Sequence, residues 1–594
     1  MDYTTLRGLK LSLFESAADG YRTTSDMACQ AKDRIDQQIT AKMRGALEGE
    51  AADAALRQLR ELSKNFHYAQ VECGLVSTAL NGLVSDLRVA RRKLDTAVED
   101  AHGEKFTVEP DGSVTYPAAG EKVDGKTPQG GTVRGTTYGA ARSVQDQAAM
   151  FDPNPNYARA KEYANRIAAA VEEATEADSK WAPKLRKLKA DDDLTVSHKD
   201  WADTQKDMHG VRKAADDYLD GIKPPPKEGT PEENAEWWNG LSDTERDDYV
   251  SLHPASVGAL DGLPAEVRDE ANRAVLAEKR GRYEMELRSI PPEPTRYFQE
   301  YRGNHAVRSE TAAWKEWNDK YGDRKEHLEG SLKGMQAIQD RFDATGEEGL
   351  PDAYLLGFSP EGNGRSIIAN GNPDTADRVA VYVPGTTSNL GSIGGDINRM
   401  TGLWRESQAM TQDQSVSTIT WLGYDAPQSI VKDAPMSHYA DDGAPAFNRF
   451  LDGLETSNST ESGGHRTVIG HSYGTTLIGS AARQGDLNAG DVVLVGSPGV
   501  QVGHARDLDV PPGRVWNEEA DGDVVPDIGR YGHGGSQWTF GGGTFIIPSD
   551  ELFGANQMST DTAGHSDYWG PGTESLKNQA AVVAGQYDRV EIEE

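Results

Sequence analysis

Near the N-terminus, apolar residues recur at alternating spacings of three and four, which is the pattern of long amphipathic helices. Two such stretches occur, one from Leu6 to Ile39 and one from Cys73 to Ala97, and Leu47-Glu48-Gly49 lies between them. Since a glycine-containing break allows one helix to fold back on the other, the pattern predicts a helical hairpin over residues 1–105.

Turn and linker residues divide the middle of the chain. Residues 106–140 contain a turn signal at Asp111-Gly112 and then a run rich in Gly, Thr and Lys, which predict a small β-hairpin and a flexible linker. Residues 141–222 return to helical composition. Residues 223–233 include three consecutive prolines and predict an extended spacer, and residues 234–349 form a further helical block.

From residue 350 the pattern changes to short apolar runs rich in β-branched residues. The clearest runs cover residues 378–383, 416–422, 467–470, 491–495 and 514–517, with helix-compatible segments between them. Such runs suit strands that are buried on both faces, and their alternation with helices predicts a mostly parallel sheet. The predicted fold class is therefore multidomain: a long α-helical N-terminal region, then an α/β domain over residues 350–594 with helices on both faces of the sheet.

One of these runs leads into a turn that suits a catalytic serine. The sequence Gly470-His471-Ser472-Tyr473-Gly474 joins the run at 467–470 to a helix-compatible segment. A turn this tight admits only small residues two positions before and after the serine, and it lifts the hydroxyl above the sheet edge. The following helix directs its N-terminal amides at developing negative charge. Ser472 is therefore the predicted nucleophile.

An acid is expected next along the chain. Asp523 follows the run at 514–517 and precedes an apolar Val-Val-Pro that can anchor the loop, so it is the predicted triad acid. The alternatives in the same acidic turn are Asp521, Glu518 and Glu519.

Only His533 and His565 follow Asp523. His565 lies beyond the last expected strand, on a loop that can reach the serine, and is the predicted general base. His533 lies earlier, in a Gly-rich stretch. His471 adjoins the serine but points elsewhere on a sharp turn, and is interpreted as structural.

A loop after the run at 378–383 supplies an oxyanion hole. Gly385 lets backbone N–H groups approach a substrate oxygen closely. The expected donors are the backbone amides of Thr386 and Tyr473.

These segments together resemble the actinobacterial α/β-hydrolase family catalogued as a domain of unknown function, DUF1023, over residues 350–590. The matching segments are Val383-Pro384-Gly385-Thr386, Trp421-Leu422-Gly423-Tyr424, Gly470-His471-Ser472-Tyr473-Gly474, Gly496-Ser497-Pro498-Gly499 and Gly564-His565-Ser566-Asp567-Tyr568. The resemblance implies an α/β-hydrolase fold and a triad of Ser472, Asp523 and His565. It implies no substrate.

The N-terminal hairpin is similar to the WXG100-type helical modules of type VII secretion, although Leu47 stands where that family has tryptophan. Tyr587-Asp588-Arg589-Val590-Glu591 matches the Y-x-x-x-E pattern, but at the C-terminus. The resemblance implies a protein partner for the N-terminal helices and export by a type VII-like route. A plain helical interaction module in a cytoplasmic protein is the alternative. The hairpin register separates Cys29 from Cys73 along the helices, so no disulfide is expected.

Charge and composition limit the partners. The chain has 62 Lys and Arg against 95 Asp and Glu in 594 residues, for a net charge of −33, which disfavours nucleic acid and anionic membranes. No window approaches the ~18 apolar residues of a spanning helix, so no stable membrane insertion is expected. No ordinary secretory signal, P-loop, dinucleotide motif or metal-ligand cluster is recognised, so no cofactor and no metal are expected.

The sequence therefore predicts a serine hydrolase of the esterase or lipase type, which acts on a small-molecule carboxylic ester through an acyl-enzyme. A peptidase or thioesterase would use the same triad. The alternative is a secretion-associated or interaction protein whose hydrolase fold is weak or inactive. No basic cluster adjoins the motifs, which favours a neutral acyl ester. Trp237 or Trp238 is expected in a helical lid over the pocket.

Overall fold

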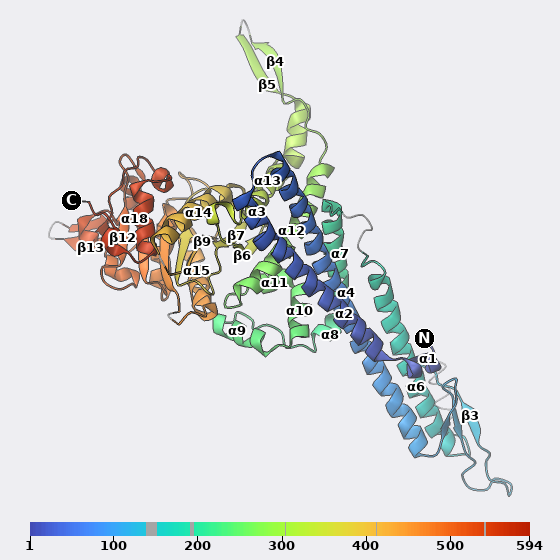
Figure 1. The fold of residues 1–594 in the computed structure, drawn as a ribbon. Coiled ribbons are helices and arrows are strands. Elements are labelled where there is room, and N and C mark those ends of the chain that lie inside the picture. The colour runs from blue at the N-terminus through green and yellow to red at the C-terminus, as the bar shows by residue number, and fades with distance from the viewer. Residues whose placement is uncertain are drawn as a thin grey trace.

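The computed structural model describes residues 1–137, 151–189, 195–302, 305–411, 413–461, 463–539 and 542–593. It is elongated, with an α/β part at one end and a helical arm that carries the N-terminus at the other (Figure 1). The predicted fold class is confirmed. The end of the expected linker and the start of the expected segment 141–222 lie outside the described residues.

The arm is built on a helical hairpin. Helices α1 (Tyr3–Gly8) and α2 (Leu11–Asp33) continue through a π-helical turn (Arg34–Thr40) into α3 (Ala41–Ala46). The chain reverses over residues 47–49, and the 54-residue helix α4 (Glu50–Gly103) runs back along α2. Ser77 Oγ donates to the Ala18 carbonyl at 2.9 Å across this pair. Cys29 and Cys73 are both free thiols, as expected.

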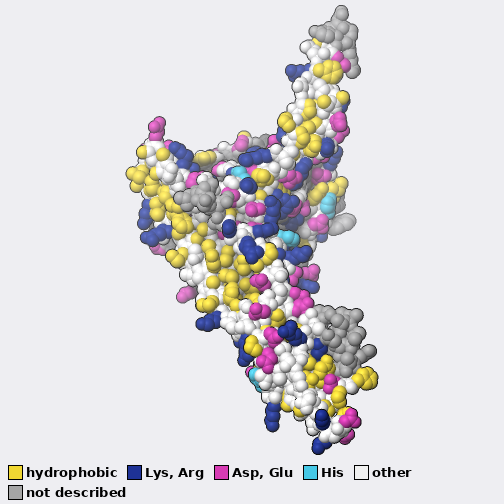
Figure 2. All heavy atoms as spheres, turned by 90° about the vertical axis from the view of Figure 1, so that its right-hand side faces the viewer, with side chains coloured by type: hydrophobic (Ala, Val, Ile, Leu, Met, Phe, Trp, Pro, Cys, Tyr) yellow, Lys and Arg dark blue, Asp and Glu magenta, His cyan; other side chains and the backbone are white. Residues whose placement is uncertain are grey.

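A third helix, α6 (Asn156–Leu185), packs on the other side of α4. Its Trp181 is fully buried, and the indole Nε1 donates to Asp86 at 2.7 Å. Gly82 faces the ring so closely that a Cβ there would lie 2.4 Å from Trp181 Cζ2. Figure 2 views the arm from this side, where hydrophobic side chains gather in patches among interspersed charged ones.

The distal end of the arm carries a small sheet. Strands β1 (Thr107–Val108) and β2 (Val114–Tyr116) form the hairpin expected at Asp111-Gly112. Strand β3 (Gly131–Val133) pairs with β2, so part of the expected linker is a third strand.

A helical block connects the arm to the α/β part. It comprises α7 (His198–Ala214), α8 (Asp216–Leu219), α9 (Pro231–Gly240), α10 (Asp243–Leu252), α11 (Pro254–Gly258), α12 (Ala265–Ser289) and α13 (Ala312–Asp343). A β-hairpin that the sequence analysis did not anticipate, β4 (Tyr297–Arg302) with β5 (His305–Glu310), projects from the block (Figure 1).

The lid expected from Trp237 and Trp238 is not formed. Both tryptophans are buried within the helical block, where the Trp237 ring meets Tyr249 edge-on at 5.1 Å. Both pack in one cluster with neighbouring apolar residues of the same block, because a paired aromatic on a short helix buries most area against its own neighbours.

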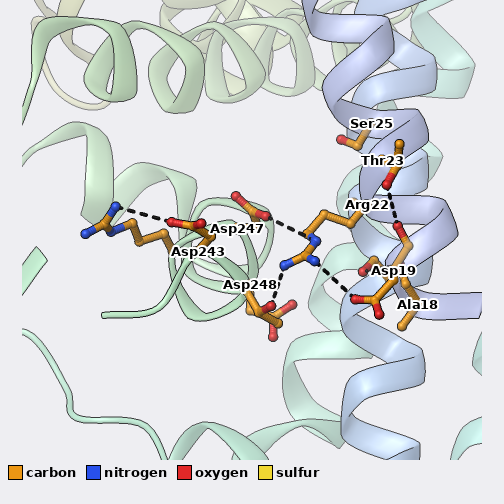
Figure 3. Close-up of polar contacts among 12 residues, drawn as sticks. Ala18, Asp19, Arg22, Thr23, Ser25, Asp243, Asp247 and Asp248 are labelled. Carbon is orange, nitrogen blue, oxygen red and sulfur yellow. Dashed lines mark hydrogen bonds and ion pairs between the residues drawn. The ribbon is translucent and has the colours of Figure 1, made fainter. Parts of the chain in front are cut away.

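Charged contacts fix the arm to the block. Arg22 of α2 reaches across to α10, where it donates to Thr244 and lies 4.0 Å from Asp247, and it also pairs with Asp19 (Figure 3). Asp248, the next residue of α10, is buried and accepts hydrogen bonds from Thr78, Asn81 and Tyr218.

The α/β part contains an eight-stranded sheet in the order β15-β12-β11-β10-β8-β9-β7-β6. The strands are β6 (Ala353–Ser359), β7 (Arg365–Asn370), β8 (Arg378–Val383), β9 (Val416–Leu422), β10 (His465–His471), β11 (Asp491–Val495), β12 (Val515–Glu518) and β15 (Asn556–Gln557). Strand β7 runs antiparallel to both of its neighbours, β6 and β9, and the other pairs of this sheet are parallel. A separate hairpin, β13 (Gly535–Thr539) with β14 (Gly542–Ile546), lies outside the sheet.

Helices cover both faces of the sheet. Strand residues alternate in direction, so Val379 and Val381 of β8 face α15 (His438–Ser457) and α16 (Tyr473–Gln484). Ala380 and Tyr382 face α14 (Ile393–Met410) and α18 (Glu574–Val583). Helix α17 (Val525–His533) stands apart, near the carboxyl ends of the strands. Short 3₁₀ turns lie at Glu347–Gly349, Leu390–Ser392, Ala505–Leu508, Glu551–Phe553, Asp567–Trp569 and Tyr587–Arg589.

Among the described residues, no helix combines the length and the apolar character needed to cross a membrane.

Candidate active site

Ser472 lies at the turn between β10 and α16, one of the central strands and the helix that follows it. Its backbone has φ 54° and ψ −128°, a conformation that an L-residue rarely adopts. A Cβ at Gly474 would lie 2.1 Å from the Val383 carbonyl oxygen, and one at Gly470 would lie 2.8 Å from Thr475 Cα. Glycine at both positions is therefore what allows the strained turn to form.

His565 and Asp523 come from two other loops at the same edge of the sheet, after β15 and β12. His565 Nδ1 lies 2.8 and 3.0 Å from the two carboxylate oxygens of Asp523. Because an ionised carboxylate only accepts, Nδ1 carries the proton and Nε2 is left as the free basic nitrogen. Gly496 underlies the pair, since a Cβ there would lie 2.8 Å from Asp523 Oδ2 and 3.1 Å from His565 Nδ1.

Two further hydrogen-bond donors stabilise the ionised form of the Asp523 carboxyl group. Tyr568 Oη donates to its Oδ2 at 2.8 Å, and the Val525 amide donates to its Oδ1 at 3.0 Å. Burial opposes ionisation of this carboxyl, but the hydrogen bonds from His565, Val525 and Tyr568 outweigh burial and lower its pKa. The sequence analysis included Tyr568 in a motif but gave it no role.

The alternative acids lie elsewhere. Glu518 is buried and accepts from Ser575 Oγ at 2.6 Å and Gln579 Nε2 at 2.8 Å, and burial raises its pKa to about 8. Within the part of the chain that the structure describes, neither Glu518, Glu519 nor Asp521 is hydrogen-bonded to His565.

The alternative base, His533, ends α17 and lines the same cavity as Ser472. Its Nε2 donates to the Ala434 carbonyl at 2.6 Å, and its ring meets the Tyr473 ring edge-on at 5.2 Å. His533 therefore connects α17 to the loop before α15.

His471 ties the loop of His565 to the strand of Ser472. Its Nε2 donates to the His565 backbone carbonyl at 2.8 Å, and the two imidazole rings lie 4.8 Å apart. Burial, with His565 and Arg399 nearby, lowers the pKa of His471 to about 3, so this imidazole stays neutral. The residue before Ser472 thus positions the loop of His565, the residue predicted to be the base.

Ser472 Oγ forms no hydrogen bond within the described residues, so the expected contact with His565 Nε2 is not made in this structure. Both side chains nonetheless line one cavity. Catalytic hydrogen bonds are often long before substrate binds.

The loop after β8 lies directly against the serine turn. A Cβ at Gly385 would lie 2.7 Å from Ser472 Cβ and 3.1 Å from the Tyr473 amide nitrogen. Thr386 and Tyr473 both line the cavity, as an oxyanion hole requires.

A neighbouring loop supports this arrangement. Tyr424 Oη donates to the Pro384 carbonyl at 2.7 Å, and the Thr387 amide donates to the Pro427 carbonyl at 2.7 Å. Gln428 Nε2 also donates to the Ser388 carbonyl at 2.9 Å. Through these contacts the segment after β9 holds the loop that carries Thr386.

The cavity itself has a volume of about 680 Å³ and opens at the carboxyl ends of the strands. Its walls include Ala434, Pro435, Pro498 and Val525. Arg399 is the one Lys or Arg side chain among its lining residues, and Arg399 Nη1 pairs with Asp396 Oδ1 at 2.9 Å. Across the described residues, no group of three or more His, Cys, Asp or Glu side chains is arranged to hold a metal ion.

The strand order, the serine turn between the fifth strand and its helix, and the following acid and histidine loops define an α/β-hydrolase. Residues 359–532 match the Abhydrolase_8 family model, described as alpha/beta hydrolase. An uncharacterized protein of Mycobacterium bovis, Mb0988c, is 32% identical over 216 residues, which is 34% of this chain and 78% of the relative. The chain belongs to this α/β-hydrolase family.

A longer match is made with an uncharacterized protein of Mycobacterium tuberculosis, Rv2079. It is 29% identical over 395 residues, 61% of this chain and 57% of the relative, so the match spans little more than half of that protein. Among solved structures, the esterase LipW from Mycobacterium marinum aligns with a TM-score of 0.25 and 14% identity, over 44% of this chain and 90% of that chain.

Proposed function

We propose that this protein is a serine hydrolase that cleaves carboxylic esters through an acyl-enzyme, with Ser472 as nucleophile, His565 as base and Asp523 as orienting acid. The observation that carries the proposal is the meeting of the strained Ser472 turn and the His565–Asp523 pair at one cavity. A positioned nucleophile, base and orienting carboxylate are the parts that acyl transfer needs.

In this mechanism His565 Nε2 takes the proton from Ser472 Oγ as the oxygen attacks the ester carbonyl carbon. The amides of Thr386 and Tyr473 stabilise the oxyanion that forms. His565 then gives its proton to the leaving alcohol as the C–O bond breaks, and the acyl group remains on Ser472. Water, activated by the same histidine, releases the carboxylic acid and restores the serine.

A neutral ester fits the cavity better than an anionic one. Arg399 is already paired with Asp396, so the lining offers no uncompensated positive charge. Most of the wall near Ser472 is apolar or backbone. Amide oxyanion donors and an apolar wall suit an acyl carbonyl, rather than the three charged oxygens of a phosphoryl group.

The test is labelling with a fluorophosphonate probe. The wild type is expected to be labelled, and Ser472→Ala is not. Ser388 and Ser566 also line the cavity, so Ser388→Ala and Ser566→Ala are matched controls that keep the label. Loss of labelling in either control, or its survival in Ser472→Ala, would overturn the nucleophile assignment.

Turnover of p-nitrophenyl butyrate separates an enzyme from an inactive fold. We expect hydrolysis by the wild type and at least about a thousandfold loss in both Ser472→Ala and His565→Ala, as for other triads. Absence of both labelling and hydrolysis in the wild type would favour an interaction protein with an inactive hydrolase fold.

For the arm we propose, from the resemblance of residues 1–105 to WXG100-type modules, a protein partner and a type VII-like export route. The helical hairpin of α2 and α4 supports this proposal. The measurement is the amount of the chain in culture filtrate with and without a working type VII system. Equal amounts would reject the export proposal.

A further inference from the structure

Apolar side chains stand exposed around the mouth of the cavity that contains Ser472. Ile430 and Val431 are 73% and 83% exposed, and Val524, Ile528 and Tyr531 are 60%, 71% and 76% exposed. We call these five residues the apolar collar. Single exposed apolar residues need no explanation, but a gathered set of large ones usually marks a binding surface.

The collar is continuous with the cavity. Ile430, Val524 and Ile528 belong to the cavity wall and are at the same time mostly exposed, so they lie at its rim. Val431 follows Ile430 directly, and Tyr531 follows Ile528 by three residues. An apolar path therefore leads from the outer surface to the serine.

Helix α17 carries most of the collar as a stripe. Val524, Ile528 and Tyr531 are spaced by four and three residues, which places them on one face of the helix. Pro526 and His533 are buried on the inner side. The helix therefore leaves large apolar side chains in solvent, where an ordinary surface helix carries polar ones.

The two collar segments are held together. His533 Nε2 donates to the Ala434 carbonyl at 2.6 Å, which joins the end of α17 to the loop that carries Ile430 and Val431. Tyr473 Oη, beside the nucleophile, donates to the Met436 carbonyl in the same loop. The exposed collar is therefore anchored directly to the serine turn.

Charged side chains of both signs lie beside the collar residues. Lys432 and Asp433 follow Val431, and Asp527 and Arg530 flank Ile528, with Arg530 paired to Asp550 at 2.8 Å. The whole chain carries a net charge of −33, which repels an anionic surface. A lipid surface without net charge therefore suits this face, since it can bind the apolar collar and does not repel the negatively charged chain.

We propose that the apolar collar seats the protein on an uncharged or zwitterionic lipid surface, from which a long-chain acyl ester passes along the collar into the cavity of Ser472. The substrate class is thus a long-chain ester presented in an aggregate, not a short ester free in solution. The proposal deepens the proposed function and rests on it for the chemical step.

Binding is tested without catalysis. Ser472→Ala protein is mixed with phosphatidylcholine vesicles and floated on a density gradient. We expect the Ser472→Ala chain to float with the vesicles, and at least tenfold less to float when Val431→Ser and Tyr531→Ser are added. These two residues point outward and do not line the cavity. Vesicles of anionic phosphatidylglycerol should bind less protein.

The matched control carries Leu13→Ser and Met27→Ser on α2. These side chains are 65% and 64% exposed, similar to the collar residues, but lie on the helical arm. The control should float as the Ser472→Ala parent does. Equal flotation of all three chains, or no flotation of the parent, overturns the proposal.

Turnover gives an independent readout. The ratio of hydrolysis of p-nitrophenyl palmitate in neutral detergent micelles to that of dissolved p-nitrophenyl butyrate should fall at least tenfold in Val431→Ser/Tyr531→Ser. The Leu13→Ser/Met27→Ser ratio should not change. An unchanged ratio in the collar variant overturns the proposal.

Two other outcomes are distinguishable. If the wild type hydrolyses neither ester, the proposed function fails, while flotation still decides whether the collar binds lipid. If sedimentation velocity shows a dimer that the collar substitutions abolish, and vesicles bind no protein, the collar is an interface between two copies of this chain, and the lipid proposal is wrong.

Discussion

Tyr568 connects two loops of the site through a single hydroxyl. Tyr568 Oη accepts a hydrogen bond from the Ala520 amide at 3.0 Å and donates one to Asp523 Oδ2 at 2.8 Å. The oxygen therefore fixes the place of Asp523, the proposed triad acid, and also favours its ionised form. The sequence placed Tyr568 in a motif, but an aromatic residue near a C-terminal helix is equally suited to core packing, so its hydrogen bonds needed the structure.

For Tyr568→Phe we expect kcat on p-nitrophenyl butyrate to fall about tenfold, the effect of about 1.4 kcal/mol in the barrier, with little change in KM. The lost bond raises the pKa of Asp523, so the acidic limb of the activity profile should move to higher pH. Tyr587→Phe is the control, since Tyr587 also donates to a buried carboxylate, Asp491 at 2.8 Å, away from the cavity. An equal shift in the control would contradict the assignment.

The protonation state of Glu518 affects the free energy of unfolding. Burial raises its pKa to about 8, well above the value of an unfolded chain. The folded state therefore binds a proton that the unfolded state releases, and stability falls as pH rises from about 4.5 to about 8. The substitution Glu518→Gln removes the titratable carboxyl, and with it this fall in stability at high pH.

The free energy of unfolding of Glu518→Gln should exceed that of the wild type at pH 9 and approach it at pH 5. The difference is expected to grow by up to about 1.4 kcal/mol per pH unit within the window. Urea denaturation at several pH values measures it. A difference that does not depend on pH would contradict the raised pKa.

Among elements, the serine turn is the one in which sequence and geometry correspond most closely. Gly474 is the second residue of α16, and a Cβ at this position would lie 2.1 Å from the Val383 carbonyl oxygen. Val383 ends β8 just before the loop that carries Thr386. A change at Gly474 therefore displaces the proposed oxyanion donors as well as the proposed nucleophile, Ser472.

Gly474→Ala is expected to lower the free energy of unfolding by about 1–3 kcal/mol, the usual effect of overpacking, and to abolish fluorophosphonate labelling. Gly210→Ala is the control, because that helical glycine has open space around it and alanine favours a helix. Full labelling of Gly474→Ala would show that the turn tolerates the displacement.

Strands β8 to β12 were predictable from short apolar runs, which are richest in β-branched residues in β8 and β11. Strands β6, β7 and β15 were missed, since β6 has no β-branched residue, β7 has polar residues at both ends, and β15 has only two residues. No helix was predicted over α17, which contains Gly529 and Gly532. It is held by tertiary contact instead: a Cβ at Gly529 would lie 2.2 Å from Pro498 Cβ.

At the scale of the whole molecule, the arm and the α/β part have separate hydrophobic cores. The arm core contains Leu83, Leu87 and Trp181, and none of its members belongs to the two clusters on the faces of the sheet. Two units with separate cores can unfold separately, so the arm and the α/β part are expected to lose structure independently.

Trp181→Ala should destabilise the arm by about 3–5 kcal/mol, because it removes a fully buried indole. Helical circular dichroism should then melt at a lower temperature, while the temperature at which fluorophosphonate labelling is lost stays near that of the wild type. If both signals are lost at the same lower temperature, the stability of the α/β part depends on the arm.

The strained backbone of Ser472 implies a trade-off between thermal stability and activity. A residue with φ 54° and ψ −128° holds about 1–3 kcal/mol of strain that glycine in its place would release. Ser472→Gly should therefore melt at a higher temperature than both the wild type and Ser472→Ala in differential scanning calorimetry, although it lacks the proposed nucleophile. A Ser472→Gly chain no more stable than Ser472→Ala would refute this. With Ser472 as the proposed nucleophile, selection of variants for heat resistance alone would then enrich inactive chains, so any directed evolution of this protein has to screen for turnover.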